Sequence, residues 1–319
     1  MSALEGLNPG LWIDGTANLR AMERRLMELW SGEGYAEVVP PLFLPEEAAR
    51  AASPEALLAR TLHVPANGEG SLALRADFTA GVAWMASRRL AALPEPLRLS
   101  YTGTVLRKPT ADRPESIEAL QAGCERISPA MGPEGDEEVA CLAARSLLAL
   151  GLEDSVLELG HWGLVGPILE RIPWPAQGKQ ALEQALNRKS VPALEILGER
   201  HGRCPEWSLL KELVHLGGRP EAVDALRPAL CAAGVEDTWE ELRGLGRGLG
   251  SEFPGLRVRL EPTDVRHWAY YSGLTVKAFT PRHSFAVLSG GRYDGLYAAL
   301  GRPFGACGFA VHLGRLLEE

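Results

Sequence analysis

The architecture of this chain is set by two segments, RLSYTGTVLR at residues 98–107 and EALQAGCER at residues 118–126. Each segment predicts a strand, and the two prolines and several charges of residues 108–117 predict a solvated turn between them. Alternate residues of a strand share a face, so Gln121, Gly123 and Glu125 point the same way. The sequence therefore predicts an amide and a carboxylate on either side of a gap.

This hairpin face suits a small zwitterion. Gln121 and Glu125 can accept from an ammonium group, and Arg107, at the end of the first strand, can pair with a carboxylate. Periodicity alone favours a simpler interpretation, in which the hairpin is ordinary and this face meets solvent. The face is therefore a candidate site that needs support from the rest of the chain.

The composition predicts a soluble cytoplasmic protein with a sizeable core. Its 319 residues allow two domains or one large one, and 46% of them are apolar. The formal net charge of −8 gives no general attraction to nucleic-acid phosphates. Residues 1–10 lack the pattern of a signal peptide, and no apolar run approaches the length of a membrane span. Five scattered cysteines without zinc-site spacing indicate reduced thiols.

Periodicity also predicts the order of elements. Helices are expected at 17–32 and 137–150, and strands at 35–39, 155–161, 256–260, 269–279 and 284–289. Residues 72–79 predict a strand that runs into a helix, and helix capping is the better explanation of both Asp77 and Thr79. The segment 290–296 is rich in glycine but lacks the spacing of a phosphate loop.

The pattern changes after residue 162, where Leu, Ala, Glu and Arg recur at helical spacing to about residue 250. This change predicts an all-helical subdomain, residues 162–254, inserted into a core formed by residues 1–161 and 255–319. The histidines of this region are not clustered, so they favour structural or exposed roles, and no metal site is expected.

An ordered set of motifs resembles the histidyl-tRNA synthetases over essentially the whole chain. The motifs are Gly34 to Pro41, Leu74 to Thr79, the hairpin from Arg107 to Glu125, Arg266 to Gly273, Gly290 to Leu296 and Gly308 to Arg315. The resemblance implies an α+β fold, the class II aminoacyl-tRNA synthetase core. That fold is an antiparallel sheet flanked by helices, here with an inserted all-helical subdomain, and it is dimeric through its first motif.

The chain departs from the synthetases where ATP would be handled. Lys108 and Pro109 follow Arg107 where the synthetases carry a glutamate, and His312 to Arg315 replaces their Gly-Leu-Glu-Arg. The chain also stops just past that motif, which leaves no room for an anticodon-binding domain. The chain keeps the residues of the amino-acid pocket and lacks the acids of the ATP site. In this combination it resembles the regulatory subunit of ATP phosphoribosyltransferase, a synthetase paralogue.

This resemblance implies a site for histidine. The site divides into Asp77, Thr79 and Gln121 for the ligand ammonium, Arg107 and Arg266 for its carboxylate, and Glu125 with Tyr271 for its imidazole. No catalytic residue, metal or cofactor is implied. The implied partners are a short catalytic subunit, histidine as the allosteric feedback ligand of the first step of histidine biosynthesis, and a second copy of this chain within a hetero-oligomer. Neither nucleic acid nor a membrane is implied.

Two other interpretations stay open. A truncated synthetase core with residual histidine activation is disfavoured by the missing ATP-site acids. A structural scaffold that binds no ligand would explain His267 and Ala269, which depart from the synthetase pattern beside the implied pocket. It would not explain why the acceptors and arginines survive together.

Overall fold

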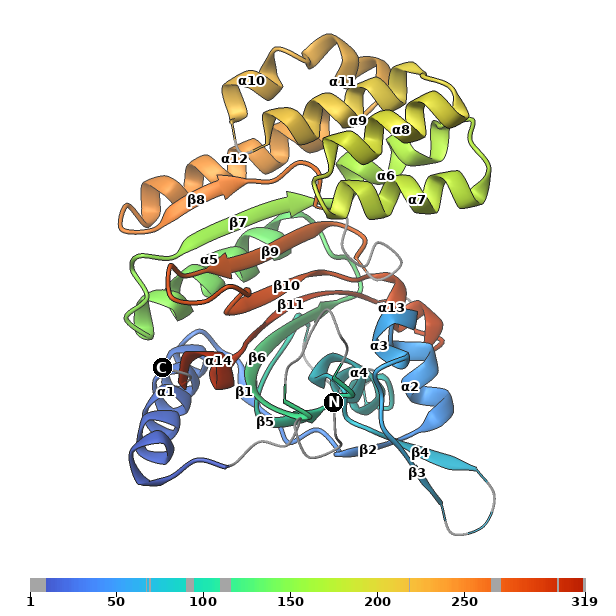
Figure 1. Ribbon diagram of the computed structural model, residues 1–319. Helices are drawn as coiled ribbons and strands as arrows, with labels where there is room; N and C mark the ends of the chain where they lie inside the picture. The colour runs from blue at the N-terminus through green and yellow to red at the C-terminus, as the bar shows by residue number, and fades with distance from the viewer. Residues whose placement is uncertain are drawn as a thin grey trace.

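Strands and helices alternate along the chain until a run of helices interrupts the pattern (Figure 1). The computed structural model describes residues 10–66, 68, 70–89, 95–109, 116–217, 219–264, 271–302 and 304–317. The strands are β1 Ala36–Glu37, β2 Phe43–Pro45, β3 His63–Pro65, β4 Ser71–Leu74, β5 Leu97–Leu106, β6 Glu118–Ser128, β7 Val156–His161, β8 Arg257–Leu260, β9 Leu274–Phe279, β10 Leu288–Arg292 and β11 Gly305–Val311. The helices are α1 Ile13–Gly32, α2 Glu46–Ala52, α3 Glu55–Leu58, α4 Phe78–Ser87, α5 Pro133–Ala149, α6 Trp162–Arg171, α7 Ala176–Asn187, α8 Val191–His201, α9 Pro205–Leu216, α10 Pro220–Asp224, α11 Arg227–Ala233, α12 Glu236–Glu252, α13 Gly295–Ala299 and α14 Leu313–Leu317.

An eight-stranded sheet organises the molecule, in the order β1-β5-β6-β11-β10-β9-β7-β8. Its pairs are antiparallel except for β1 with β5 and β7 with β8. The expected hairpin is β5 and β6, and it places Leu106 opposite Glu118 and Tyr101 opposite Gly123. A smaller antiparallel sheet, β2-β4-β3, lies beside it. The predicted antiparallel sheet flanked by helices is therefore confirmed.

Helices α1 and α5 pack against each other and against strands of the large sheet. Trp30 of α1 is fully buried, and its indole Nε1–H donates to Oγ of Ser146 on α5 at 2.9 Å. The same ring meets Phe309 of β11 edge to face, with 5.9 Å between centroids. The apolar stripe predicted for residues 17–32 thus ties α1 to both the sheet and α5.

Helices α6 to α12 follow one another between β7 and β8, where a helical region was expected. In Figure 1, α6 to α11 lie together at the top and α12 runs along β8. Their buried residues, such as Leu194 and Leu213, belong to the same apolar cluster as Val276 of the sheet. The division into a core of 1–161 and 255–319 and an insertion of 162–254 stays a proposal. No helix in the described part of the chain has the length and apolarity that crossing a bilayer requires.

Three strand predictions were wrong in extent. The strand predicted for 269–279 begins only at Leu274 among the described residues, because Ser272 and Gly273 form a bend. The strand predicted for 35–39 holds only Ala36 and Glu37 as β1, because the chain leaves the sheet edge before Pro40.

The strand predicted for 284–289 instead begins at Leu288 and continues through Gly290 to Arg292 as β10. A Cβ at Gly290 would overlap the backbone of Phe309 on β11, so these glycines permit close strand packing rather than forming a loop.

Candidate functional site

A cavity of about 530 Å³ lies over the middle of the large sheet. Its walls come from α3, the start of α4, the β5–β6 hairpin and the strands β9, β10 and β11. The lining includes most of the residues expected to form the ligand site, namely Asp77, Thr79, Arg107, Gln121 and Tyr271. Arg266 falls outside the described residues. The cavity therefore brings together side chains that lie almost 200 positions apart in the sequence.

Asp77 has both a capping and a lining position. It is the N-cap of α4, where its Oδ1 accepts from the backbone N–H of Ala80 at 3.1 Å, which confirms the capping prediction. Burial raises the pKa of its carboxyl group, while the Ala80 N–H and the nearby Arg107 lower it. Thr79 is not the cap, because its Oγ1 donates instead to Oε1 of Glu125 at 2.9 Å.

Glu125 lies beneath the cavity wall rather than on it. Its side chain is buried, and its carboxyl group accepts from the hydroxyls of Thr79 at 2.9 Å, Tyr101 at 3.1 Å and Tyr293. Burial raises its pKa from the ordinary 4.5 to about 8, and the hydrogen bonds from Thr79 and Tyr101 oppose that rise. Thr79, Tyr101 and Tyr293 all line the cavity, so Glu125 reaches it through three hydroxyls.

The expected gap over Gly123 is wrong. A Cβ at Gly123 would come within 2.5 Å of the Tyr101 hydroxyl and within 2.7 Å of its ring carbon Cζ. Tyr101 sits directly opposite on β5 and stacks on Phe78, with 4.3 Å between ring centroids and 13° between planes. The glycine is therefore needed because an aromatic ring from the partner strand covers it. The phenol fills the space that was predicted to receive a ligand.

Gln121 is hydrogen-bonded at the cavity wall to residues that sequence analysis did not select. Its Nε2 lies 2.9 Å from Nδ1 of His312, and Nε2 of His312 lies 2.9 Å from Oγ of Ser289. In the tautomer whose Nδ1 accepts from Gln121, the ring donates to Ser289, and the amide Oε1 is the atom that can accept from a ligand. His312 was noted only as a departure from the synthetase motif.

Cationic side chains outnumber acids around the cavity. Among the residues that the structure describes, the lining holds the cations Arg60, Arg107, Lys277 and Arg315 and one carboxylate, that of Asp77. Arg107 donates to the carbonyl of Ala76, Arg60 donates to the carbonyl of Lys108 at 3.0 Å, and Lys277 pairs with the buried Asp264. Only Arg107 was expected here, because no local pattern brings the other three cations to one place. The balance favours an anionic group on the ligand.

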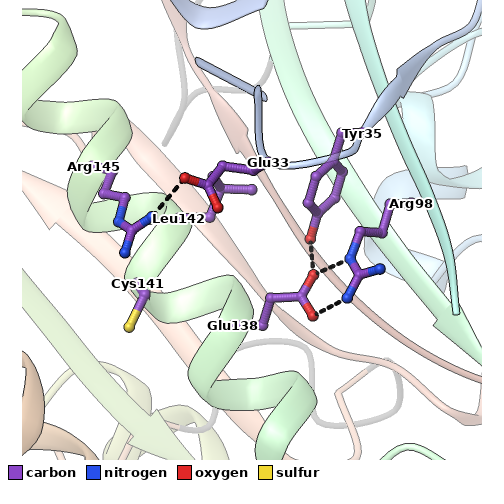
Figure 2. A pocket seen from close by; sticks show the side chains of 7 residues that line it. All are labelled: Glu33, Tyr35, Arg98, Glu138, Cys141, Leu142 and Arg145. Atoms are coloured by element: carbon purple, nitrogen blue, oxygen red, sulfur yellow. Dashed lines mark hydrogen bonds and ion pairs between the residues drawn. The ribbon is translucent and has the colours of Figure 1, made fainter. Parts of the chain in front are cut away.

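A second cavity, of about 270 Å³, lies beside α5 (Figure 2). Arg98 holds both oxygens of Glu138, at 2.6 and 2.8 Å, and Tyr35 donates to the same carboxylate at 2.9 Å. Arg145 pairs with Glu33 at 2.6 Å. These ion pairs connect the end of α1 and strand β5 to α5. The charged residues of this cavity therefore hold elements of the fold together. Over the residues that the structure covers, no group of three or more His, Cys, Asp or Glu is placed to hold a metal ion.

The histidyl-tRNA synthetase family model matches residues 14–316 of this chain. An ATP phosphoribosyltransferase regulatory subunit/histidyl-tRNA synthetase from Bacillus halodurans superposes with a TM-score of 0.86 at 26% identity, covering 98% of this chain and 81% of that one. A chain of the ATP phosphoribosyl transferase (HisG:HisZ) complex from Thermotoga maritima has the same fold, with a TM-score of 0.68 at 17% identity over 93% of this chain and 97% of that one. Fold and family model together define a class II synthetase core of the histidyl type.

Curated relatives distinguish the regulatory subunits from the synthetases within that class. The ATP phosphoribosyltransferase regulatory subunit of Desulforamulus reducens is 32% identical over 295 residues, which is 92% of this chain and 72% of the relative. That of Symbiobacterium thermophilum is 34% identical over 304 residues, 94% of this chain and 75% of the relative. The chain belongs to the family of ATP phosphoribosyltransferase regulatory subunits. The expectation of a regulatory rather than a catalytic subunit is thereby confirmed.

Proposed function

We propose that this chain binds histidine in the 530 Å³ cavity and passes its occupancy to a short catalytic subunit of ATP phosphoribosyltransferase. The catalytic subunit would need this chain for activity in the first step of histidine biosynthesis. Histidine, the end product, would then act as the feedback inhibitor. One observation carries the proposal, namely the convergence of Asp77, Thr79, Arg107, Gln121 and Tyr271 on one cavity.

The polarity of the cavity fits a free amino acid. Asp77, Thr79 and Gln121 supply oxygen acceptors for an ammonium group, and Arg107 supplies a guanidinium for a carboxylate. The volume is within the range of roughly 300–1,000 Å³ that is usual for small-molecule sites. In this proposal the carboxylate also meets Arg266, a role that rests on the sequence motif alone.

The imidazole would be recognised through hydroxyl groups. Glu125 holds Thr79, Tyr101 and Tyr293 by hydrogen bonds, and these three residues face the cavity. Because the three hydroxyls already donate to Glu125, their oxygens can only accept from a ligand, and the N–H of an imidazole is a donor that fits them. Glu125 then selects histidine by fixing the direction in which each hydroxyl points. Tyr271, which is half-buried and lines the same cavity, would complete the ring pocket.

Activation of the partner is the first expected result. Adding this chain to a short-form catalytic subunit should raise the initial rate of phosphoribosyl transfer, and the chain alone should show none. The rise should saturate with added chain, because it requires a complex of fixed composition. A mixture that turns over at the rate of the catalytic subunit alone would disprove the regulatory assignment. The Thermotoga maritima complex supports the pairing as a precedent in fold.

We also propose a two-fold homodimer through the first motif. The edge strand β1 and the segment after it expose Val39, Leu42 and Phe43, of which Val39 is 89% exposed. Exposed apolar residues beside an open sheet edge favour association, because pairing covers both the apolar residues and the sheet edge.

We further propose that the protein works in the cytoplasm. The five described cysteines are free thiols, which supports a reducing compartment.

Sedimentation velocity tests the dimer. The wild-type chain should sediment as a dimer at micromolar concentration, and Val39→Asp should shift it toward monomer because a charge would be buried at the interface. Ile196→Asp on α8 is the matched control, since Ile196 is an exposed apolar residue far along the helical region. A wild-type monomer at that concentration would refute the interface.

A further inference from the structure

A third cavity, of about 270 Å³, lies between α5 and α12 and shares no lining residue with the cavity proposed for histidine. Helix α12 packs against α5, β7 and β8, and Figure 1 shows it running beside those strands. The walls come from both helices, with His161 at the end of β7 and Leu274 at the start of β9. The cavity therefore sits where the helical run meets the sheet.

The α12 wall is apolar and has room for a ligand. Leu242, Leu249 and Leu274 are buried lining residues. Between them, Gly244 and Gly248 present no side chain, and a Cβ at either position would meet no atom within 4 Å. Glycine inside a helix weakens that helix. Both glycines are exposed and, among the described residues, meet no packing neighbour, so they leave the solvent side of the cavity open.

Asp136 gives this cavity a buried acceptor that lacks a donor. The residue lines the cavity and is only 6% exposed. Its Oδ2 lies 3.5 Å from Nη1 of Arg292, and the Cys307 thiol hydrogen-bonds the same carboxyl group. Its Oδ1 has no hydrogen-bond partner among the described residues. Buried polar atoms in native proteins are nearly always paired, so an orphan acceptor in a cavity indicates a missing donor.

The other polar groups of the cavity carry negative charge or none. Glu137, Glu241 and Glu252 are exposed lining residues, and of these Glu252 pairs with Arg145 at 3.1 Å. His161 accepts from the backbone N–H of Gly163 through Nδ1 at 3.0 Å, which leaves the proton of the neutral ring on Nε2. Burial lowers the pKa of His161 to about 4, so the ring is uncharged. In the part of the chain described, the lining contains no lysine or arginine.

We propose that the cavity between α5 and α12 binds an alkylammonium group, with the ammonium donating to Oδ1 of Asp136 and the alkyl chain lying over Gly244 and Gly248. A charged donor on an apolar chain matches an acidic rim, an orphan carboxylate oxygen and a leucine-lined wall. A free amine and a lysine side chain of a protein carry the same group. The cavity of Figure 2 lacks this character, because Arg98 and Arg145 already pair its acids.

Calorimetric titration of the full chain with n-pentylammonium, and with neutral 1-pentanol, tests the proposal. Gly248→Leu should fill the cavity and reduce n-pentylammonium affinity at least ten-fold. Gly250→Leu is its matched control, because Gly250 lies on the same helix, is exposed like Gly248 and has an equally open Cβ position, but does not line the cavity. Asp136→Asn should weaken binding about ten- to a hundred-fold, the range for losing a charged hydrogen-bond partner.

The proposal predicts that n-pentylammonium binds the wild type and Gly250→Leu at millimolar concentrations and that 1-pentanol does not. Equal binding of the alcohol, undiminished binding by Gly248→Leu, or no binding to the wild type would each overturn it. If Asp136→Asn does not fold, the two glycine variants still decide. Titration with Nα-acetyl-lysine amide distinguishes a free amine from a lysine side chain as the natural ligand. Tighter binding of this probe than of n-pentylammonium assigns the site to a lysine side chain, and weaker binding assigns it to a free amine.

Discussion

Glu125→Gln is expected to be more stable relative to the wild type at pH 9 than at pH 5, by about 4 kcal/mol. Burial raises the pKa of Glu125 from 4.5 to about 8 in the folded protein. The folded state therefore binds this proton more tightly than the unfolded state does. Between the two pKa values the wild type loses stability as the pH rises, and the loss is complete above the folded pKa. Glutamine cannot ionise, so the variant escapes this loss.

Urea unfolding at a series of pH values measures the effect. The quantity to follow is the difference in free energy of unfolding between the wild type and Glu125→Gln. Other buried acids, such as Asp136, contribute equally to both proteins and cancel in that difference. Glu118→Gln, at an exposed position of the same strand, corrects for the loss of a surface carboxylate. A difference that stays constant from pH 5 to 9 would show that Glu125 titrates normally.

Glu125→Ala is expected to weaken histidine binding about ten- to a hundred-fold. The substitution removes the acceptor that orients the hydroxyls of Thr79, Tyr101 and Tyr293 at the cavity wall. Activation of the catalytic subunit should persist, because Glu125 is buried and cannot touch a partner. Inhibition of the complex should move to higher histidine by a similar factor, since coupling between binding sites is reciprocal.

Calorimetry on the chain and inhibition curves on the complex check this result together. Glu118→Ala is the control, as it removes a carboxylate from the same strand at an exposed position. An inhibition curve for Glu125→Ala that coincides with the wild type, with the complex still assembled, would remove Glu125 from the site. It would also weaken the assignment of the cavity as a whole.

The sequence predicted the fold well because the elements carry strong local signals. The β5–β6 hairpin, the amphipathic α1 and the helical run from α6 to α12 all follow from periodicity and punctuation by proline and glycine. The cap at Asp77 was also predictable, because capping depends on residues three positions apart. These features need no knowledge of distant contacts.

The interior of the site was less predictable because it depends on register. The predicted strands end at Arg107 and begin again at Glu118. If these two residues were paired, Tyr101 would lie opposite Cys124. The strand ends one residue earlier, at Leu106, and Tyr101 then faces Gly123. This shift by one residue decides that a phenol fills the predicted gap.

The roles of Tyr293 and His312 depend on strand pairing across the sheet, which local patterns do not contain. Tyr293 reaches Glu125 from a position 168 residues away, and His312 reaches Gln121 across 191 residues. The motif resemblance included both segments without placing either at the ligand site or giving either side chain a role. Long-range pairing therefore supplies what the sequence lacked.

Calorimetric titration of the wild-type chain with histidine, with and without ATP, tests the assignment of the 530 Å³ cavity to histidine. We expect one saturable histidine site per chain and the same affinity when ATP is present. We expect no heat of binding from ATP alone, because Pro109 and Gly314 stand where the synthetases carry carboxylates for ATP and magnesium. Absence of histidine binding, or binding that requires ATP, would contradict this assignment.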